Sequence, residues 1–517
     1  MRSLYLLLFC TLFSFVAQAQ LALNVLDFGA KNDSSALATT AIKEAIAKAS
    51  QAGGGTIYFP PGTYLTGPIH LKSNITLFIE AGAELCFSDN FDHYLPMVPS
   101  RWEGTMVTNF SPFIYAYEAE NIRITGRGTL NGNGKKWWAY SEVHVKNSPE
   151  SKWQKEFHKL NKNVLHPDLP GWVERGFLRP PFIQPMYCKN VRIDGITIKN
   201  SPFWTVNPEF CDNVTIDGVT INNPPSPNTD GINPESCSNV HISNCHISVG
   251  DDCITIKSGK DRSGRKEARP AENYTITNCT MLSGHGGVVI GSEMSGDVKK
   301  IVISNCIFDG TDRGIRIKTA RGRGGVVEDI QVSNIVMKNI KQQAIVLDMQ
   351  YAKTDREPVS ERTPRFSNIH LSNITAQGEQ AGYLNGLEEM PIENVSFSNM
   401  VMETKTGFDI RASKGIVFSN VSVNPSTGPA IAATNVSGLQ INGLRTAAGF
   451  SGSATLKFNN VKRAFIANCL IMEPIKTFLE ASGNETEALL LKANDLRLVQ
   501  NPLYISDAPE NAVTLEK

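Results

Sequence analysis

The sequence predicts an all-β protein that folds as one parallel β-helix, a solenoid of stacked coils. A phrase such as Asn190-Val-Arg-Ile-Asp-Gly-Ile-Thr-Ile recurs along the chain, with copies that begin at Asn213, Asn239 and Asn273. These starts lie about 25 residues apart, a period typical of a solenoid and too short for the ~40-residue blade of a propeller. β-Branched residues at alternate positions place the apolar side chains of each copy on one face of a strand.

The first residues are typical of a secretory signal. Arg2 is followed by a mostly apolar run over residues 4–16 and by Ala17-Gln18-Ala19, a small-x-small pattern. We expect cleavage after Ala19 and a secreted or periplasmic protein. A membrane anchor is the alternative, but the run is shorter than the ~20 apolar residues that a span needs, so no membrane span is predicted.

Residues 20–505 are predicted to form a single β-helix domain. Residues 36–50 have Leu37, Ile42 and Ile46 near helical spacing and predict an N-terminal helix that caps the open end of the solenoid. Residues 132–177 depart from the repeat, are rich in tryptophan and charge, and predict a long folded excursion. Residues 506–517, in the polar stretch beyond Asn501, are predicted to be a loosely attached C-terminal tail.

The composition gives no indication of a nucleic-acid partner, and none is predicted. Fifty basic and fifty acidic residues leave a formal net charge of +0, so attraction of an anionic ligand has to come from local placement of charge. Ten cysteines include Cys10 in the signal, and the odd remainder includes Asn-Cys pairs at similar repeat positions, such as Cys245 and Cys279. We favour buried free thiols stacked in the core over a disulfide framework, although the sequence leaves pairing open.

Four short motifs fall in consecutive repeats: Asn228-Thr-Asp230, Gly250-Asp251-Asp252, Gly284-His285-Gly286 and Arg316-Ile-Lys318. Each is common in turns or on solvated strands when it occurs alone. Together they are spaced by roughly one coil each, so their side chains are expected to stack in one strip of the cylinder.

Within that strip, Asp230 and Asp251 are expected to stack directly, because nearly one coil separates them. Asp252 follows at once, and neighbours on a regular strand point to opposite faces. Both aspartates can serve one site only if the chain bends there. Arg316 and Lys318 are two residues apart and share a face.

These motifs, in this order, resemble glycoside hydrolase family 28, the polygalacturonases. The resemblance extends from Val25-Leu-Asp-Phe-Gly-Ala through Ser201-Pro-Phe-Trp to Gly284-His-Gly-Gly-Val-Val-Ile-Gly-Ser and covers roughly residues 25–440. It implies a right-handed β-helix and inverting hydrolysis of α-1,4-galacturonosyl bonds in pectic polysaccharides or oligogalacturonides. It also implies no metal and no cofactor, and we expect a monomer.

The same resemblance implies a role for each matched residue. Asp251 is expected to be the general acid, while Asp230 and Asp252 hold and deprotonate the attacking water. Crowded carboxylates cannot all ionise easily, so one of them keeps a proton to donate. His285 is expected to orient or tune the acid. The expected substrate-binding residues are Asn228, Arg316, Lys318 and Tyr351, with Arg316 and Lys318 gripping a uronate carboxylate.

Two basic segments flank these motifs. Arg313, Arg321 and Arg323 surround the Arg-Ile-Lys strand, and residues 260–269 form a second basic loop. They are either a cationic rim for an anionic polymer or ordinary solvated loops. Because this loop and the 132–177 excursion could wall off one end of a groove, we favour attack at chain ends (exo action) over internal cleavage.

Three other functions stay open. A pectate-lyase-type β-helix would need calcium and a strong base, and no carboxylate ladder beyond the three aspartates is evident. A rhamnogalacturonan or other decorated-pectin hydrolase of the same family would make less use of Arg316 and Lys318. A non-catalytic carbohydrate-binding β-helix belongs to another class of protein and predicts that Asp251→Asn changes nothing.

Overall fold

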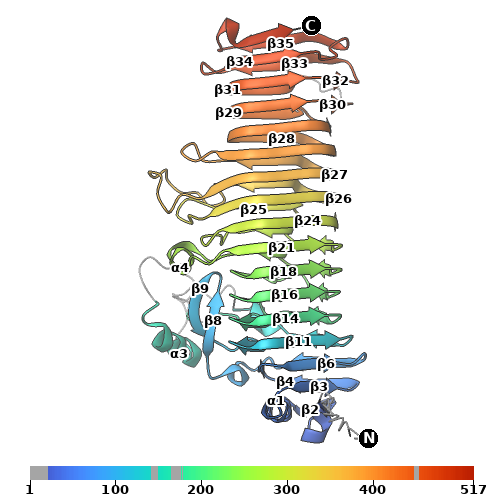
Figure 1. The fold of residues 1–517 in the computed structure, drawn as a ribbon, viewed down its shortest axis with the longest axis vertical. Coiled ribbons are helices and arrows are strands. Elements are labelled where there is room, and N and C mark those ends of the chain that lie inside the picture. The colour runs from blue at the N-terminus through green and yellow to red at the C-terminus, as the bar shows by residue number, and fades with distance from the viewer. Residues whose placement is uncertain (1–20, 141–149, 165–175, 177, 448–452, 517) are drawn as a thin grey trace, which may run out of the picture.

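The computed structural model describes residues 21–140, 150–164, 176, 178–447 and 453–516. The predicted signal segment and parts of the 132–177 excursion lie outside these ranges. The described chain forms a right-handed parallel β-helix in which 31 strands make one continuous sheet. Figure 1 shows the coils stacked along one axis, with the two chain ends at opposite ends. No described helix is both long enough and apolar enough to cross a membrane.

Each coil contributes strands to three faces. The first face begins with β1 (Ala22–Asn24), β3 (Gly55–Phe59), β6 (Ile75–Ile79), β11 (Glu120–Gly126), β14 (Lys189–Asp194), β16 (Asp212–Asp217), β18 (Ser238–Ser243) and β21 (Ala271–Thr277). The second face begins with β2 (Asp33–Leu37), β4 (Gly62–Thr66), β7 (Ala83–Phe87), β12 (Thr129–Asn131), β15 (Thr197–Lys199), β17 (Thr220–Asn222), β19 (His246–Ser248) and β22 (Thr280–Ser283).

The third face carries the motifs. Its strands are β5 (Ile69–Leu71), β10 (Ile114–Tyr117), β13 (Ile183–Met186), β20 (Asp252–Ile256), β23 (Gly286–Ile290) and β25 (Ile315–Lys318). Longer strands then turn the corners between faces: β24 (Val298–Asp309), β26 (Val326–Asp348), β27 (Arg365–Asn385), β28 (Ile392–Pro425), β29 (Ile431–Asn442) and β31 (Ala454–Ala467). The last coils contain β30 (Arg445–Thr446), β32 (Leu470–Ile471), β33 (Ile475–Ser482), β34 (Glu487–Lys492), β35 (Val499–Ser506) and β36 (Val513–Glu516).

The repeated asparagine has a structural reason. Asn190, Asn213 and Asn239 adopt φ values of 55°, 57° and 57°, the left-handed region that asparagine tolerates better than most residues. The Asn213 side-chain amide donates to Asn190 Oδ1 at 2.7 Å, and Asn190 donates to Asn121 Oδ1 at 2.8 Å. The repeat therefore marks one turn per coil, held by a ladder of amide hydrogen bonds.

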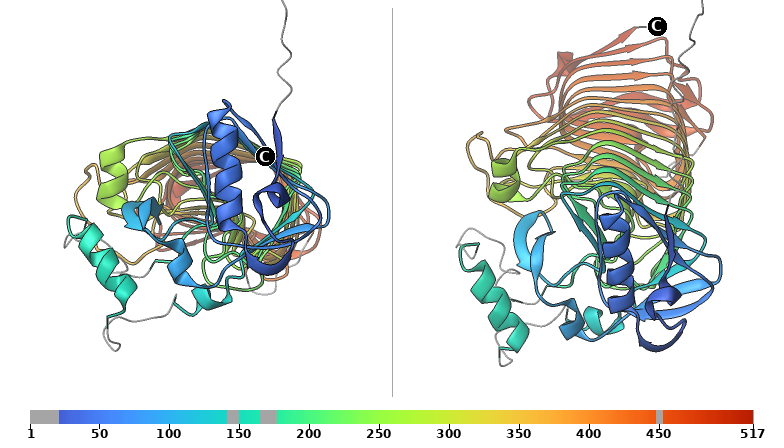
Figure 2. Two further views of the ribbon diagram at one scale, coloured as in Figure 1. Left: turned by 90° about the horizontal axis from the view of Figure 1, so that it is seen from below. Right: turned by 60° about the horizontal axis from the view of Figure 1, so that its bottom comes forward.

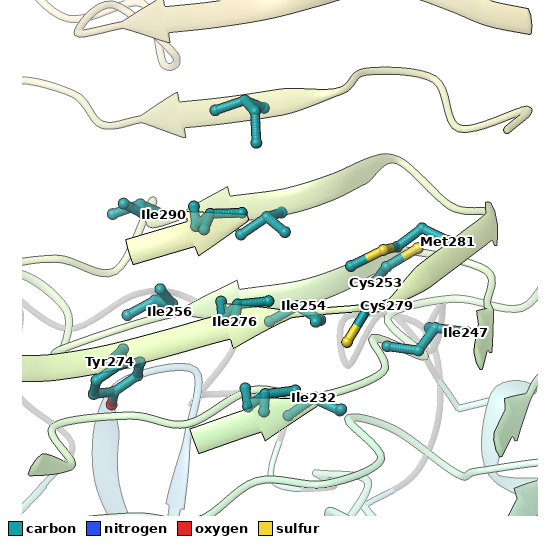
Figure 3. Packing of buried hydrophobic residues seen from close by; sticks show 14 of the residues in the cluster. Ile232, Ile247, Cys253, Ile254, Ile256, Tyr274, Ile276, Cys279, Met281 and Ile290 are labelled. Atoms are coloured by element: carbon teal, nitrogen blue, oxygen red, sulfur yellow. The ribbon is translucent and has the colours of Figure 1, made fainter. Parts of the chain in front are cut away.

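The core is a stack of matching apolar rows. Ile232 lies beside Ile254, and Val288 follows Ile254 on the next coil. Figure 3 shows Ile232, Ile254 and Ile290 pointing into the same interior. All nine described cysteines are free, and all but Cys86 are buried, which confirms the expectation of stacked thiols.

The ends of the solenoid differ from the sequence expectation in detail. Helix α1 (Thr39–Gln51) lies across the N-terminal end, as Figure 2 shows, and confirms the predicted capping helix, although residues 36–37 belong to β2 instead. The predicted loose tail is wrong, because β36 pairs with β34 from Leu489 opposite Val513 onwards. The polar composition misled the prediction because an edge strand needs backbone pairing more than apolar side chains.

A side layer stands beside the third face. It contains α2 (Lys135–Trp138), α3 (Lys152–Asn161), α4 (Asp261–Glu267) and a hairpin of β8 (Val98–Trp102) and β9 (Thr105–Asn109). β8 and β9 pair in an antiparallel direction, whereas the other described strand pairs are parallel. Figure 1 shows α3, α4 and the hairpin on the same side of the cylinder.

Candidate active site

The four motifs converge on the third face, where β20, β23 and β25 stack. Asp252 is the first residue of β20, and Asp251 lies in the turn before it. This turn supplies the bend that two neighbouring aspartates need in order to face one site. His285 precedes β23, and its backbone N–H donates to the Asp251 carbonyl at 2.8 Å. Arg316 and Lys318 lie on β25.

The register corrects one expectation. Ile232 pairs with Ile254, and the Gly231 N–H donates to the Asp252 carbonyl at 3.0 Å. Asp230 therefore stacks on Asp252, and not on Asp251 as the spacing suggested. One carboxylate oxygen from each of the three aspartates still lies within 4.8 Å of the others.

Asp252 is held in its charged form by two cations. Its Oδ2 accepts a hydrogen bond from Lys318 Nζ at 2.8 Å, and Arg316 Nη1 lies 3.6 Å from its Oδ1. Burial by itself raises the pKa of Asp252, but the cations of Lys318 and Arg316 outweigh it, and the pKa is lowered. Asp252 is thus suited to act as a base.

Asp230 has the opposite environment. Its side chain is buried, and Asn233 Nδ2 donates to its Oδ2 at 2.9 Å. Burial raises the pKa of Asp230 well above its ordinary value, and the nearby Asp251 charge raises it further. The cluster therefore retains a proton at pH values where isolated aspartates have lost theirs, and such a proton belongs to the coupled group more than to one residue.

Asp251 is the aspartate most open to solvent. Its side chain is 20% exposed, whereas that of Asp252 is 2% exposed. His285 Nδ1 lies 3.0 Å from Asp251 Oδ1, and this contact raises the pKa of His285. The arrangement points Asp251 at the groove and leaves His285 beside it as a partner.

The motifs line one cavity of about 510 Å³. All eight residues predicted for the site are part of its wall: Asn228, Asp230, Asp251, Asp252, His285, Arg316, Lys318 and Tyr351. The catalytic and binding roles assigned to them remain predictions. Tyr351 presents its ring to both cations, with Arg316 Cζ at 5.4 Å and Lys318 Nζ at 5.3 Å from the ring centroid. Asn228 accepts a hydrogen bond from Arg179 Nη2 at 2.6 Å.

A buried ion pair in the cavity wall was missed from the sequence. Lys257 Nζ lies 2.7 Å from Glu293 Oε2 and 4.6 Å from the centroid of the Trp204 ring. Burial opposes the charge of Lys257, but Glu293 and Asp230 outweigh it and raise the pKa of the lysine. A lysine directly after the largely apolar run 253–256 was the available signal.

The hairpin also contributes to the cavity, and it was not predicted. Glu103, at its tip, lines the cavity and lies 3.2 Å from Lys260 Nζ. The Lys260 N–H donates to the Gly104 carbonyl at 3.2 Å. The tip and the basic loop thus join beside the ends of the third-face strands, where Lys260 also lies 3.9 Å from Glu293 Oε1, after β23, and Asp261 pairs with Arg323, after β25.

The three carboxylates are close enough to share a cation. Lys318 and Arg316 already face both oxygens of Asp252, so the chain supplies positive charge to this cluster from its own residues. The cluster therefore combines a retained proton, an ionised carboxylate and two cations beside a solvent-open groove.

Comparisons with known proteins agree with this geometry. The model of glycosyl hydrolases family 28 matches residues 174–427, which contain all eight site residues. Residues 22–148 match a model described as rhamnogalacturonase A/epimerase, pectate lyase-like, and contain none of the eight.

Curated and solved relatives cover most of the chain. A probable polygalacturonase of Vitis vinifera is 30% identical over 78% of this chain and 81% of that protein. An endo-polygalacturonase of Pectobacterium carotovorum subsp. carotovorum is 32% identical over 74% of this chain and 88% of that protein. The structure of a hyperthermoactive exopolygalacturonase from Thermotoga maritima superposes with a TM-score of 0.67 at 33% identity, over 78% of this chain and 91% of that one. The chain therefore belongs to glycosyl hydrolases family 28 and is a glycoside hydrolase.

Proposed function

We propose that the enzyme is exported and hydrolyses α-1,4-galacturonosyl linkages of polygalacturonate with inversion, working from chain ends. We propose a uronate substrate because a pair of cations on β25 lies beside the aspartate cluster. Lys318 and Arg316 are nine-tenths buried, and both line the cavity. Cations held this way beside the reacting groups suit a carboxylated sugar better than a neutral one.

Asp251 is the proposed general acid, because it is the aspartate whose side chain reaches the groove. The glycosidic oxygen takes a proton from Asp251 as the bond to the anomeric carbon breaks. Water held between Asp230 and Asp252 attacks that carbon from the opposite side and gives up a proton to the ionised Asp252. Inversion follows from this one-step displacement.

The free enzyme needs one proton on the cluster and one ionised carboxylate. The raised pKa of Asp230 supplies the retained proton, and its coupling to Asp251 lets that proton be shared with the acid. The lowered pKa of Asp252 keeps the base ionised. His285 holds the Asp251 carboxyl in place. After turnover Asp252 releases its new proton to water, and Asp251 regains a proton from water through His285, whose side chain is exposed to solvent.

Exo action is supported by the wall that the hairpin tip and the basic loop build beside the cavity. The Glu103–Lys260 contact and the Lys260–Gly104 hydrogen bond hold the two segments together there. In this proposal the wall limits the room beside the aspartates, so that the sugar seated against it is a chain terminus.

Product analysis on polygalacturonate tests the proposal. Galacturonate monomer as the product from the earliest time points supports exo hydrolysis, whereas mixed oligomers indicate internal cleavage. The anomeric configuration of the first product, followed by NMR, tests inversion. Unsaturated products that vanish with a chelator would instead identify a lyase, and activity confined to rhamnogalacturonan would identify the decorated-pectin alternative.

A further inference from the structure

The third face continues beyond the site toward the C-terminal coils. The cavity extends toward these coils as far as Gln342, on β26, and Tyr351. A polymer that leaves the cavity on this side continues across the coils that follow β25. These coils belong to β26, β27, β28, β29 and β31.

Strand register defines the path. From Lys318, the residues opposite one another on successive coils are Asp348, Asn385, Arg411, Thr434 and Asn459. Arg316 begins a parallel row that leads through Val346, Tyr383, Asp409 and Ala432 to Lys457. With about 4.8 Å between coils, Arg411 lies roughly 14 Å along the axis from Lys318.

A second cavity, of about 370 Å³, lies on this path. Polar groups suited to a sugar line it: Gln380, Thr406, Arg411, Thr434, Lys457 and Asn459. Asp409 is the acidic residue in its wall, so cationic and neutral donors predominate.

Arg411 repeats an arrangement found at the active site. Its Cζ lies 5.7 Å from the centroid of the Tyr383 ring, as that of Arg316 lies 5.4 Å from Tyr351. Asp409 accepts hydrogen bonds from Nε and Nη2 of Arg411. Nη1 has no partner among the described residues, and a guanidinium carries five N–H donors. The guanidinium can thus bind a second carboxylate without releasing the first.

Lys457 is available in the same way. Its Nζ lies 3.1 Å from Glu480, and its side chain is 52% exposed. An ammonium has three donors, and an exposed ion pair of this kind is weak enough to rearrange around a ligand.

We propose that the surface formed by Tyr383, Arg411, Thr434, Lys457 and Asn459 is a distal subsite that binds uronate units of the polymer several coils from the cut. This inference rests on the proposed function, because it takes the ligand to be the same polyuronate. The subsite adds affinity for long chains and does not touch the reacting sugars.

The test compares long and short substrates. The variant Arg411→Gln/Lys457→Gln, and each single change, are assayed on polygalacturonate and on digalacturonate. We expect KM for the polymer to rise about 3- to 10-fold, as for lost charge-assisted contacts at an exposed site, with kcat and the dimer KM kept. Arg445→Gln is the matched control, because Arg445 is exposed on β30 of another face.

Binding in the Asp251→Asn background, measured by calorimetry, gives a second reading that does not need turnover. There the double change should weaken polymer binding and leave trimer binding unaltered. If the double variant has the same KM for the polymer as Arg445→Gln, the proposed subsite is refuted. A parallel rise in the KM of both substrates also overturns it, since that pattern means damage at the active site. If the wild-type enzyme hydrolyses neither of the two substrates, the proposed function is refuted instead.

Discussion

The three aspartates differ because their neighbours differ. Asp252 faces two cations, Asp230 is buried beside another carboxylate, and Asp251 reaches solvent next to His285. Identical side chains thereby lie in different environments, which suits them to the separate tasks that we propose for them. These differences depend on contacts that span more than one coil.

Replacing the proposed acid gives the first prediction. Asp251→Asn keeps the size of the side chain and removes the proton donor, so kcat should fall by about 10²- to 10⁴-fold, with KM close to that of the wild type. Reducing-sugar assays give kcat, and calorimetry gives binding. Asp329→Asn, a change at an exposed carboxylate of β26 outside the third face, is the control. Unchanged turnover in Asp251→Asn would favour a non-catalytic binding protein.

The second prediction concerns pH. Lys318 helps to lower the pKa of Asp252, so Lys318→Gln should raise that pKa. Because the base must be ionised, the acidic limb of the kcat profile should move to higher pH, and KM should rise through the lost grip on the uronate. Lys414→Gln, an exposed pair partner of Glu393, should leave the profile in place. A fall in kcat without any displacement of that limb would show that Lys318 does not set the charge of Asp252.

The hairpin is an inserted element held by buried polar contacts. Arg101 on β8 is fully buried, with Glu209 Oε2 at 3.5 Å and Glu235 Oε1 at 3.4 Å. Trp102 stacks on Phe203 with ring centroids 4.7 Å apart. These anchors fix the hairpin tip, whose Glu103 lines the cavity, so an element outside the coils helps to shape the site.

Removing the buried cation should therefore cost stability. Arg101→Ala leaves Glu209 and Glu235 without their counterion, and breaking a buried pair in this way costs about 3–5 kcal/mol. Arg123→Ala removes an arginine whose side chain is 45% exposed beside Asp194, and solvent screening limits that cost to about 1 kcal/mol or less. Urea denaturation measures both. Equal losses in the two variants would mean that the hairpin anchor is not a buried electrostatic one.

The solenoid as an assembly depends on covered ends. Each coil pairs with its neighbours, and a terminal coil without a cover exposes both apolar residues and unpaired backbone. Helix α1 covers one end, and β35 and β36 form the last rung at the other. The final residues are thus part of the fold.

Truncation tests that role. Removal of residues 499–517 exposes the edges of β33 and β34, so the shortened chain should aggregate and unfold at a lower temperature. Light scattering coupled to gel filtration measures this, and the mature full-length chain should elute as a monomer. A truncated monomer with an unchanged melting temperature would mean that the end needs no cover.

Local patterns in the chain were enough to predict the coils and the strip of functional residues. Strand periodicity and a left-handed asparagine turn are properties of a few adjacent residues, and a motif spaced by one coil stacks on the next. The eight predicted site residues accordingly share one cavity.

The stacking of the coils determined the register and the long-range contacts, which the local sequence patterns do not predict. Asp230 faces Asp252 because the register shifts by one residue from the simple spacing, and register is set by how whole coils pack. Glu103 and Lys260 meet across 157 positions of sequence, and Lys257 with Glu293 across 36. The charges of the site and the contact between the hairpin tip and the basic loop depend on such long-range contacts, which no short stretch of the chain encodes.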